Sequence, residues 1–234
     1  MAAVTAAGGT ISLLAGTVVL RLTLTGAYRR YVRVGMWPWL LAAGLAIVVL
    51  GAATLVTAMR HGPAEDAHGH GRRGEQRVGW LLLAPIAALL LVAPPPLGAY
   101  GVGRGAAVDV RAGAEGFGFG RLDPGDEPVP MTLLEFGQRS VDRDGVSFNG
   151  VAVRLTGFVA GAEHHGFLLA RYEIACCAAD AVPVVIRVVG VPGPAPPNDR
   201  WVTVTGLFRP GGGTTPWLAA TAVAEVPAPR DPYE

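Results

Sequence analysis

The residues best suited to chemistry in this sequence are two adjacent cysteines and an aspartate that follows them closely. Cys176 and Cys177 are the only cysteines in the chain, and Asp180 comes three residues later. Thiolate and carboxylate groups are ligands for zinc and similar divalent ions, so the three side chains form a candidate metal site. Adjacent cysteines on a strand point to opposite faces and do not bond easily to each other.

Other roles compete with metal binding at these residues. We expect the cysteines to lie on a strand, so that one thiol packs in the core and the other points outward. Redox chemistry is the third interpretation, although the Cys-x-x-Cys spacing of dithiol motifs is missing. An aspartate near a strand end more often caps a turn through its own backbone. Arg171 and Glu173 share a strand face, which predicts a surface ion pair.

The five histidines form two further groups of candidate ligands. His164 and His165 lie in a predicted hairpin turn, where they could join the cysteines in binding a metal or could be plain exposed turn residues. A glycine-rich loop carries the other three, and these metal-site candidates are His61, His68 and His70. The alternative for this loop, which also contains Glu65 and Asp66, is a solvated linker of low complexity.

The first hundred residues have the composition of a membrane region. The chain is 51% hydrophobic and only 16% charged, which is typical of membrane proteins rather than soluble domains. Three apolar segments are long enough to cross a bilayer: residues 2–20 (extending to 28), 37–59 and 78–97. Tryptophans near the start of the second and third segments fit the interfacial belt. We therefore predict three transmembrane helices within residues 1–100 and a multi-pass protein of the cell membrane.

The arginines give an orientation for these segments. Arg29, Arg30 and Arg33 crowd the first loop, whereas Arg104 and Arg111 follow the third span. Three spans place both groups on the same side of the bilayer. The second loop, on the other side, contains as many arginines as the first loop or more, together with three acids, so the positive-inside rule is nearly balanced there: Arg60, Arg72, Arg73 and Arg77, with Glu65, Asp66 and Glu75. Adding Arg104 and Arg111 to the first-loop side tips the count toward a cytoplasmic location for that side. The C-terminal domain is then predicted to be cytoplasmic. A cleaved signal peptide is disfavoured because the arginines follow the first apolar run instead of preceding it.

The remaining chain predicts a linker and an all-β domain. Glycine and proline are dense over residues 101–130, which indicates a linker, and residues 131–139 predict a short helix capped by Thr132. Five segments rich in β-branched residues follow, at 151–159, 167–176, 183–189, 201–208 and 217–226. Five strands of this size fit an OB-like barrel spanning residues 131–234. OB folds often bind nucleic acid, but no stripe of basic residues supports that partner here.

The chain resembles a bacterial family in the order of these features. The matching motifs are Gly157-Phe158-Val159, Ala170 to Ala181, Trp201 to Gly206 and Asp231-Pro232-Tyr233-Glu234. With the preceding apolar helices and the proline-stopped third span, this order is similar to that of the YcgQ-type membrane proteins. They are regarded as the second subunit of a two-component permease.

The resemblance implies a partner permease in the same bilayer and a connection with divalent metal handling, zinc being favoured. It implies no reaction, and this chain has fewer loop histidines than some members. We expect a non-enzymatic accessory subunit of a permease, involved in the transport or delivery of a zinc-like ion. The alternatives are a membrane-tethered metal or redox sensor and a membrane-anchored OB-type binding module.

Overall fold

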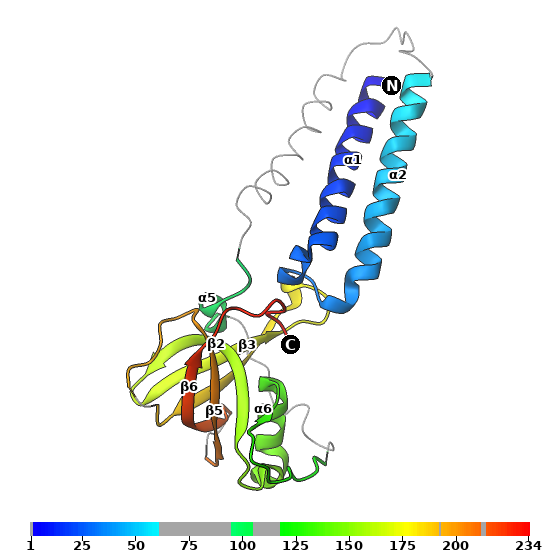
Figure 1. The fold of residues 1–234 in the computed structure, drawn as a ribbon. Helices are drawn as coiled ribbons and strands as arrows, with labels where there is room; N and C mark the ends of the chain where they lie inside the picture. Colours follow the sequence, from blue (N-terminus) through cyan, green and yellow to red (C-terminus); the bar gives the residue numbers. More distant parts are fainter. Residues whose placement is uncertain (1, 61–94, 105–117, 192, 212–213) are drawn as a thin grey trace. The chain divides into compact units, whose positions relative to one another are not determined.

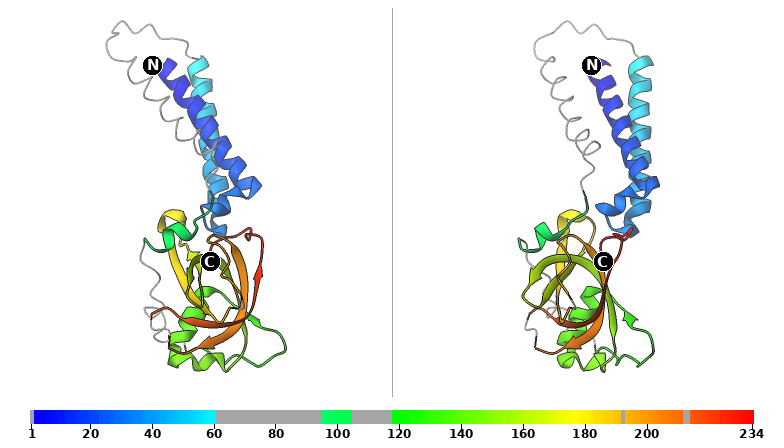
Figure 2. Two further views of the ribbon diagram at one scale, coloured as in Figure 1. Left: turned by 90° about the vertical axis from the view of Figure 1, so that its left-hand side faces the viewer. Right: turned by 60° about the vertical axis from the view of Figure 1, so that its left-hand side comes forward.

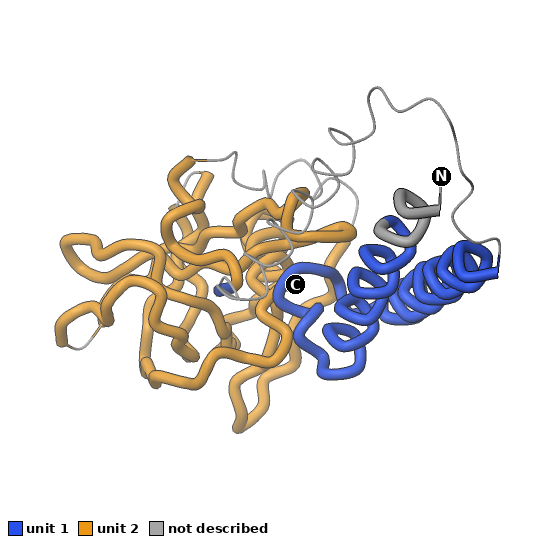
Figure 3. The backbone as a smooth tube through the Cα atoms, turned by 90° about the horizontal axis from the view of Figure 1, so that it is seen from above, with its two compact units in different colours: residues 1–95 blue, residues 96–234 orange. Residues whose placement is uncertain are grey.

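The computed structural model describes residues 2–60, 95–104, 118–191, 193–211 and 214–234. The chain divides into two compact units, residues 1–95 and 96–234 (Figure 3), and each is described by itself. Most of the predicted third span, residues 78–97, lies outside the described residues, as do His61, His68 and His70.

The first unit contains a pair of long helices. Helix α1 (Ala2–Thr25) and helix α2 (Trp37–Arg60) are joined by two short 3₁₀ helices, η1 (Ala27–Arg30) and η2 (Val34–Met36), and run side by side (Figure 1). Glycines bring them close: a methyl group added to Gly9 would lie 3.1 Å from the carbonyl oxygen of Gly51, and one added to Gly16 would lie 3.0 Å from that of Gly44. The two contacts run in opposite chain directions, so the helices form an antiparallel hairpin.

The hairpin buries small residues and exposes large apolar ones. Gly44 and Gly51 are buried, whereas Leu24 and Met59 are 76% and 74% exposed and Trp39 is also exposed. A soluble helix would place its large apolar side chains in the core, but helices in lipid pack through small residues and leave the large ones to the acyl chains. Residues Gly8–Thr25 and Val34–Arg60 are long and apolar enough to span a membrane. Two of the three predicted spans are thus found as apolar helices.

The second unit contains a closed barrel of five strands. Its strands are β2 (Val153–Glu163), β3 (Gly166–Glu173), β4 (Val182–Val189), β5 (Trp201–Arg209) and β6 (Trp217–Glu225). The antiparallel pairs are β2–β3, β3–β4, β5–β6 and β2–β5, and the parallel pair β4–β6 completes the ring. This closure is consistent with the predicted OB-like barrel, and all five strands occur where the sequence pattern predicts them. A two-residue strand, β1 (Val129–Pro130), pairs in parallel with β2.

Strand β2 closes the barrel because it bends between two partners. Its first half pairs with β5 and its second half with β3, and the register shifts between Val159 and Gly161. At the corner, a Cβ on Gly157 would lie 2.6 Å from the carbonyl oxygen of Ala170, so a side chain there would push the strands apart. Such bulges and glycine corners are the usual means of curving a sheet into a barrel.

Helix α6 (Leu133–Val141) covers one end of the barrel interior (Figure 2). The Thr132 hydroxyl accepts from the Glu135 backbone N–H, which confirms the predicted cap. The segment η3 (Asp142–Phe148) follows. It is kinked by left-handed backbone at Arg143, Asp144 and Gly145, and it adds Phe148 to the interior core. The core members shared by the helices and strands are Leu133, Phe136, Phe148, Val153, Leu155, Val159, Phe167, Leu169, Val184, Ile186, Val188, Val202, Val204 and Leu218.

A second, smaller core lies between the barrel and the segments that cover it. It consists of Phe158, Ala170, Tyr172, Ile174, Trp201 and Tyr233. The short helix α5 (Ala99–Val102) packs against this cluster. The residues 231–234 also dock here, because Tyr172 and Tyr233 form a parallel bridge and the Glu234 N–H donates to the Tyr172 carbonyl at 2.9 Å. The smaller core thus anchors both the start and the end of the second unit.

Candidate metal centre

Both cysteines lie in the turn between β3 and β4, not on a strand. Strand β3 ends at Glu173 and β4 begins at Val182, so the predicted strand reaching Cys176 is too long. Cys176 is exposed and Cys177 is half-buried, and both are free. The expectation of one thiol packed in the core and one outward on the same strand is therefore wrong. The next residues, Ala178–Asp180, form the single-turn 3₁₀ helix η4.

Asp180 ends the strand by capturing backbone donors. Its Oδ1 accepts from the Ala175 N–H at 2.9 Å, and its Oδ2 accepts from the N–H groups of Cys176 at 2.9 Å and Cys177 at 3.2 Å. These donors would otherwise extend the ladder of β3, so the carboxylate replaces a strand partner with a turn. The predicted turn-capping role of Asp180 is confirmed.

The two thiols lie against this carboxylate. The Cys176 thiol donates to Asp180 Oδ2 at 2.8 Å, and its Sγ lies 3.7 Å from that of Cys177. The hydrogen bond to Asp180, followed by the contact with Cys177, raises the pKa of Cys176 to about 11. The same thiol donor, with the three backbone N–H groups, lowers the pKa of Asp180 to about 2. One potential ligand atom from each residue lies within 4.8 Å of the other two.

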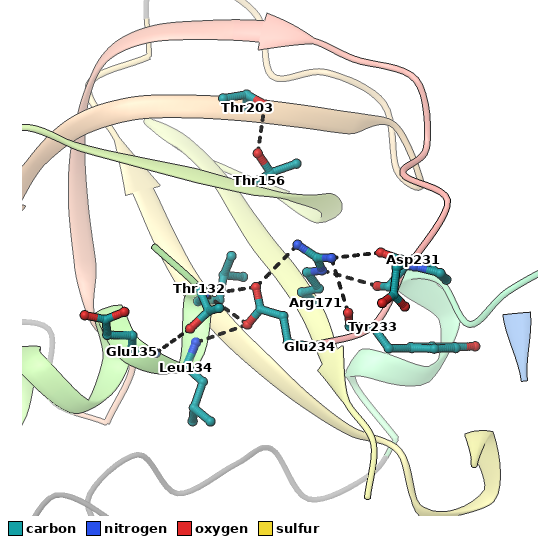
Figure 4. Close-up of polar contacts among 11 residues, drawn as sticks. Thr132, Leu134, Glu135, Thr156, Arg171, Thr203, Asp231, Tyr233 and Glu234 are labelled. Atoms are coloured by element: carbon teal, nitrogen blue, oxygen red, sulfur yellow. Dashed lines mark hydrogen bonds and ion pairs between the residues drawn. The ribbon is translucent and has the colours of Figure 1, made fainter. Parts of the chain in front are cut away.

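A buried ion pair braces the strand that leads into this turn (Figure 4). Arg171 donates to three carbonyl groups of the final segment, those of Asp231 at 2.8 Å, Tyr233 at 3.2 Å and Pro232 at 3.3 Å. Its guanidinium lies 3.5 Å from the Glu234 carboxylate, with the two side chains 17% and 4% exposed. The segment carrying Glu234 is thereby fixed beside Tyr172, directly before the cysteine turn.

Glu234 also connects this segment to helix α6. Its carboxylate accepts from the N–H groups of Leu133, at 3.0 and 3.1 Å, and of Leu134, at 3.3 Å. These are donors that the first turn of a helix leaves unpaired. Burial raises the pKa of Glu234, although the Arg171 charge and the helix N–H groups oppose that effect.

The partner of Arg171 differs from the predicted one. The spacing of Arg171 and Glu173 predicts a surface pair between them, but the structure pairs Arg171 with Glu234. The missed signal is strand parity: Arg171 has the same parity as Phe167 and Leu169, both fully buried, and it lies opposite buried Val184. A charge on an inward-facing position requires a buried partner.

The histidines are not brought to the cysteines. His164 and His165 are exposed in the β2–β3 turn, as predicted, but that turn lies at the opposite end of β3 from Cys176. Seven residue steps along β3 correspond to about 23 Å. The structure therefore excludes a site shared by these histidines with Cys176, Cys177 and Asp180. Among the described residues, those three are the group whose ligand atoms converge.

These features define a class of protein: a small closed β-barrel of OB-like type, with an exposed thiol–carboxylate turn, on the same chain as an apolar helical hairpin. Residues 139–234 match the family model of the DUF1980 C-terminal domain, a family of uncharacterised function. The match includes all five barrel strands, the cysteine turn and Glu234, but not the hairpin. No curated protein and no solved structure matches the chain.

Proposed function

We propose that this chain is a non-enzymatic membrane subunit that assists a separate permease in the transport or delivery of a divalent metal ion. The observation that carries the proposal is the inverted packing of the hairpin, with glycines such as Gly44 and Gly51 inside and large apolar side chains outside. Lipid is the solvent in which that arrangement is favourable. The hairpin then anchors the barrel to the membrane.

The limited membrane region favours an accessory role over a lone transporter. Alternating-access carriers use repeated helical bundles around a site near the bilayer midplane. Two apolar helices among the described residues, with a third predicted over 78–97, are few for such a bundle. The resemblance to YcgQ-type proteins supports a permease as the partner, and the ligand atoms of Cys176, Cys177 and Asp180 support a thiophilic metal as the cargo.

The proposal is tested by reconstitution. The chain is purified from native membranes under mild detergent, and stoichiometric recovery of a polytopic membrane protein is expected. Liposomes containing both proteins should take up zinc, whereas liposomes containing this chain alone should not. Zinc uptake by the chain alone would refute the accessory role, and equal uptake by the partner with and without the chain would refute its participation.

Exposure of Cys176 favours a membrane-tethered sensor as the second candidate. A sensor would change the state of its thiols without any effect on flux. Uptake by the two-protein liposomes that is unchanged by Cys176→Ser, together with altered partner binding, would select the sensor instead.

A further inference from the structure

We propose that Cys176, Cys177 and Asp180 form an open three-ligand site for a zinc-like divalent ion, with the fourth coordination position available to water or to a ligand from a partner protein. The proposal rests on the proposed function for its biological role, and it names the site through which the metal would be handled. Its ligands are the two Sγ atoms and a carboxylate oxygen of Asp180, which the β3–β4 turn already brings within 4.8 Å of one another.

The spacing of the two sulfurs fits tetrahedral zinc. Zinc–sulfur bonds of about 2.3 Å at a tetrahedral angle place two thiolates about 3.8 Å apart. The Sγ atoms of Cys176 and Cys177 are separated by 3.7 Å. Adjacent cysteines therefore reach the required separation without a change in the backbone of the turn.

The contact between Cys176 and Asp180 requires a small adjustment. Zinc bonds of about 2.3 Å to sulfur and about 2.0 Å to oxygen place the two atoms about 3.5 Å apart. Cys176 Sγ and Asp180 Oδ2 are now 2.8 Å apart because a thiol proton lies between them. Asp180 is held by three backbone N–H groups, so the exposed Cys176 side chain is the group that moves, by about 0.7 Å on this geometry.

The donor set determines which ions the site would take. Thiolates favour zinc and other soft or borderline ions over magnesium and calcium, which prefer oxygen ligands. Structural zinc sites are closed by four protein ligands, whereas sites with three protein ligands keep an exchangeable position. Cys176 is exposed and Asp180 is half-buried, so an incoming ligand can reach the ion. An exchangeable position suits the transfer of a metal between proteins.

The experiment is a cobalt and zinc titration of the purified full chain, reduced with a phosphine under anaerobic conditions. We expect one equivalent of cobalt to produce thiolate-to-metal charge-transfer absorption in the near ultraviolet. Zinc should then displace the cobalt and abolish this absorption. Cys176→Ser and Cys177→Ser should each weaken zinc binding at least ~10-fold and reduce this absorption, and Asp180→Asn should weaken binding while keeping much of the turn.

Two histidine variants serve as controls. His164→Ala with His165→Ala alters the other end of β3, and replacing His61, His68 and His70 with alanine alters the second loop; both should leave the charge-transfer absorption unchanged. A wild-type chain without this absorption, or one whose absorption survives Cys176→Ser combined with Cys177→Ser, would overturn the proposal. Protection of both thiols from alkylation by zinc, measured on the wild type by mass spectrometry, tests the site without any variant that could misfold.

The outcomes separate this site from the proposed function. A chain that recovers its membrane partner and promotes uptake but binds no metal at these thiols refutes the site alone. A chain that binds one zinc with thiolate ligation but has no effect on flux through any partner refutes the permease role alone.

Discussion

Removing Arg171 should destabilise the barrel far more than removing an arginine whose ion pair is exposed. The Arg171→Ala variant leaves the Glu234 carboxylate buried without its counter-charge, and it leaves the carbonyl groups of Asp231, Pro232 and Tyr233 without their donor. Breaking a buried ion pair by removing one partner costs about 3–5 kcal/mol. We expect a loss of unfolding free energy in this range.

Arg200 supplies a control in which the ion pair is exposed. Its pair with Glu225 joins β6 to the segment before β5 at 3.4 Å, but the two side chains are 53% and 57% exposed. Exposed pairs contribute about 0.2–1 kcal/mol, so Arg200→Ala should cost at most that amount. The structure therefore predicts that Arg171→Ala loses several times more unfolding free energy than Arg200→Ala.

Hydrogen exchange of the most protected amides in β3 and β4 measures this difference in the full-length chain. At about 1.4 kcal/mol per tenfold change, Arg171→Ala should accelerate their exchange between roughly 150-fold and 5,000-fold. Arg200→Ala should accelerate it by no more than about sixfold. Equal effects of the two variants, or a loss below about 1 kcal/mol for Arg171→Ala, would show that the ion pair with Glu234 does not contribute as a buried pair does.

The double variant Arg171→Ala with Glu234→Gln tests the cause of that loss. If the loss of unfolding free energy arises from an uncompensated charge, neutralising Glu234 should recover part of it. The sum of the losses of the two single variants should then exceed the loss of the double variant. Additive losses would mean that the donors to the backbone carbonyls, not the ion pair, carry the energy.

Three further results are expected. A pKa of about 11 for Cys176 leaves about 0.1% thiolate at pH 8, against about 10% at the ordinary thiol pKa of 9.0. Because the thiolate is the nucleophile, alkylation of Cys176, followed by mass spectrometry, should be about 100-fold slower than that of an ordinary thiol, and Asp180→Asn should restore most of that rate. A rate unaffected by Asp180→Asn would contradict the hydrogen bond. Gly51→Leu should overpack the contact between helices α1 and α2, cost about 1–3 kcal/mol of stability and lower the thermal midpoint of the hairpin in detergent. Gly8→Leu should not, because a Cβ at Gly8 would have nothing within 4 Å. Equal shifts of the midpoint would argue against the close helix contact at Gly51. Burial raises the pKa of Glu234 above its unfolded value. The contribution of Glu234 to folding stability is therefore fully present below the unfolded pKa and is lost as pH rises through the folded pKa. The stability of the wild type relative to Glu234→Gln should fall over that pH window, and a rise would show that the charge-assisted hydrogen bonds dominate.

Local patterns predicted the elements of the barrel well. Alternating β-branched segments placed all five strands, and Thr132 predicted the start of helix α6 through its capping hydroxyl. The apolar runs predicted both helices of the hairpin, because length and hydropathy suffice to identify such helices. The glycine contacts between them could not be predicted, since they depend on how two helices face each other.

Two predictions, the end of strand β3 and the partner of Arg171, were wrong. In both cases the true partner is a residue distant in sequence or a side chain that takes the place of a backbone group. Strand β3 stops at Glu173 because Asp180 takes the next N–H groups and residues 231–234 pair beside Tyr172. Neither partner is visible in the pattern of residues 167–176, which continues as a strand. Arg171 was misassigned for the same reason, because its acid lies sixty-three residues away in sequence.

The ion pair of Arg171 and Glu234 connects the stability of the barrel to the candidate metal centre. Glu234 fixes residues 231–234 on helix α6 and beside Tyr172, and the Ile174 N–H donates to the Glu234 carbonyl at 3.4 Å, one residue before the turn that Asp180 caps. The cysteine turn is thus held from both sides, by a buried ion pair before it and by its own aspartate within it. Arg171→Ala should therefore weaken zinc binding as well as the fold, because ligand spacing depends on the end of β3. A variant that loses stability at Arg171 yet retains the zinc affinity of the wild type while folded would mean that Asp180 alone sets the geometry of the turn.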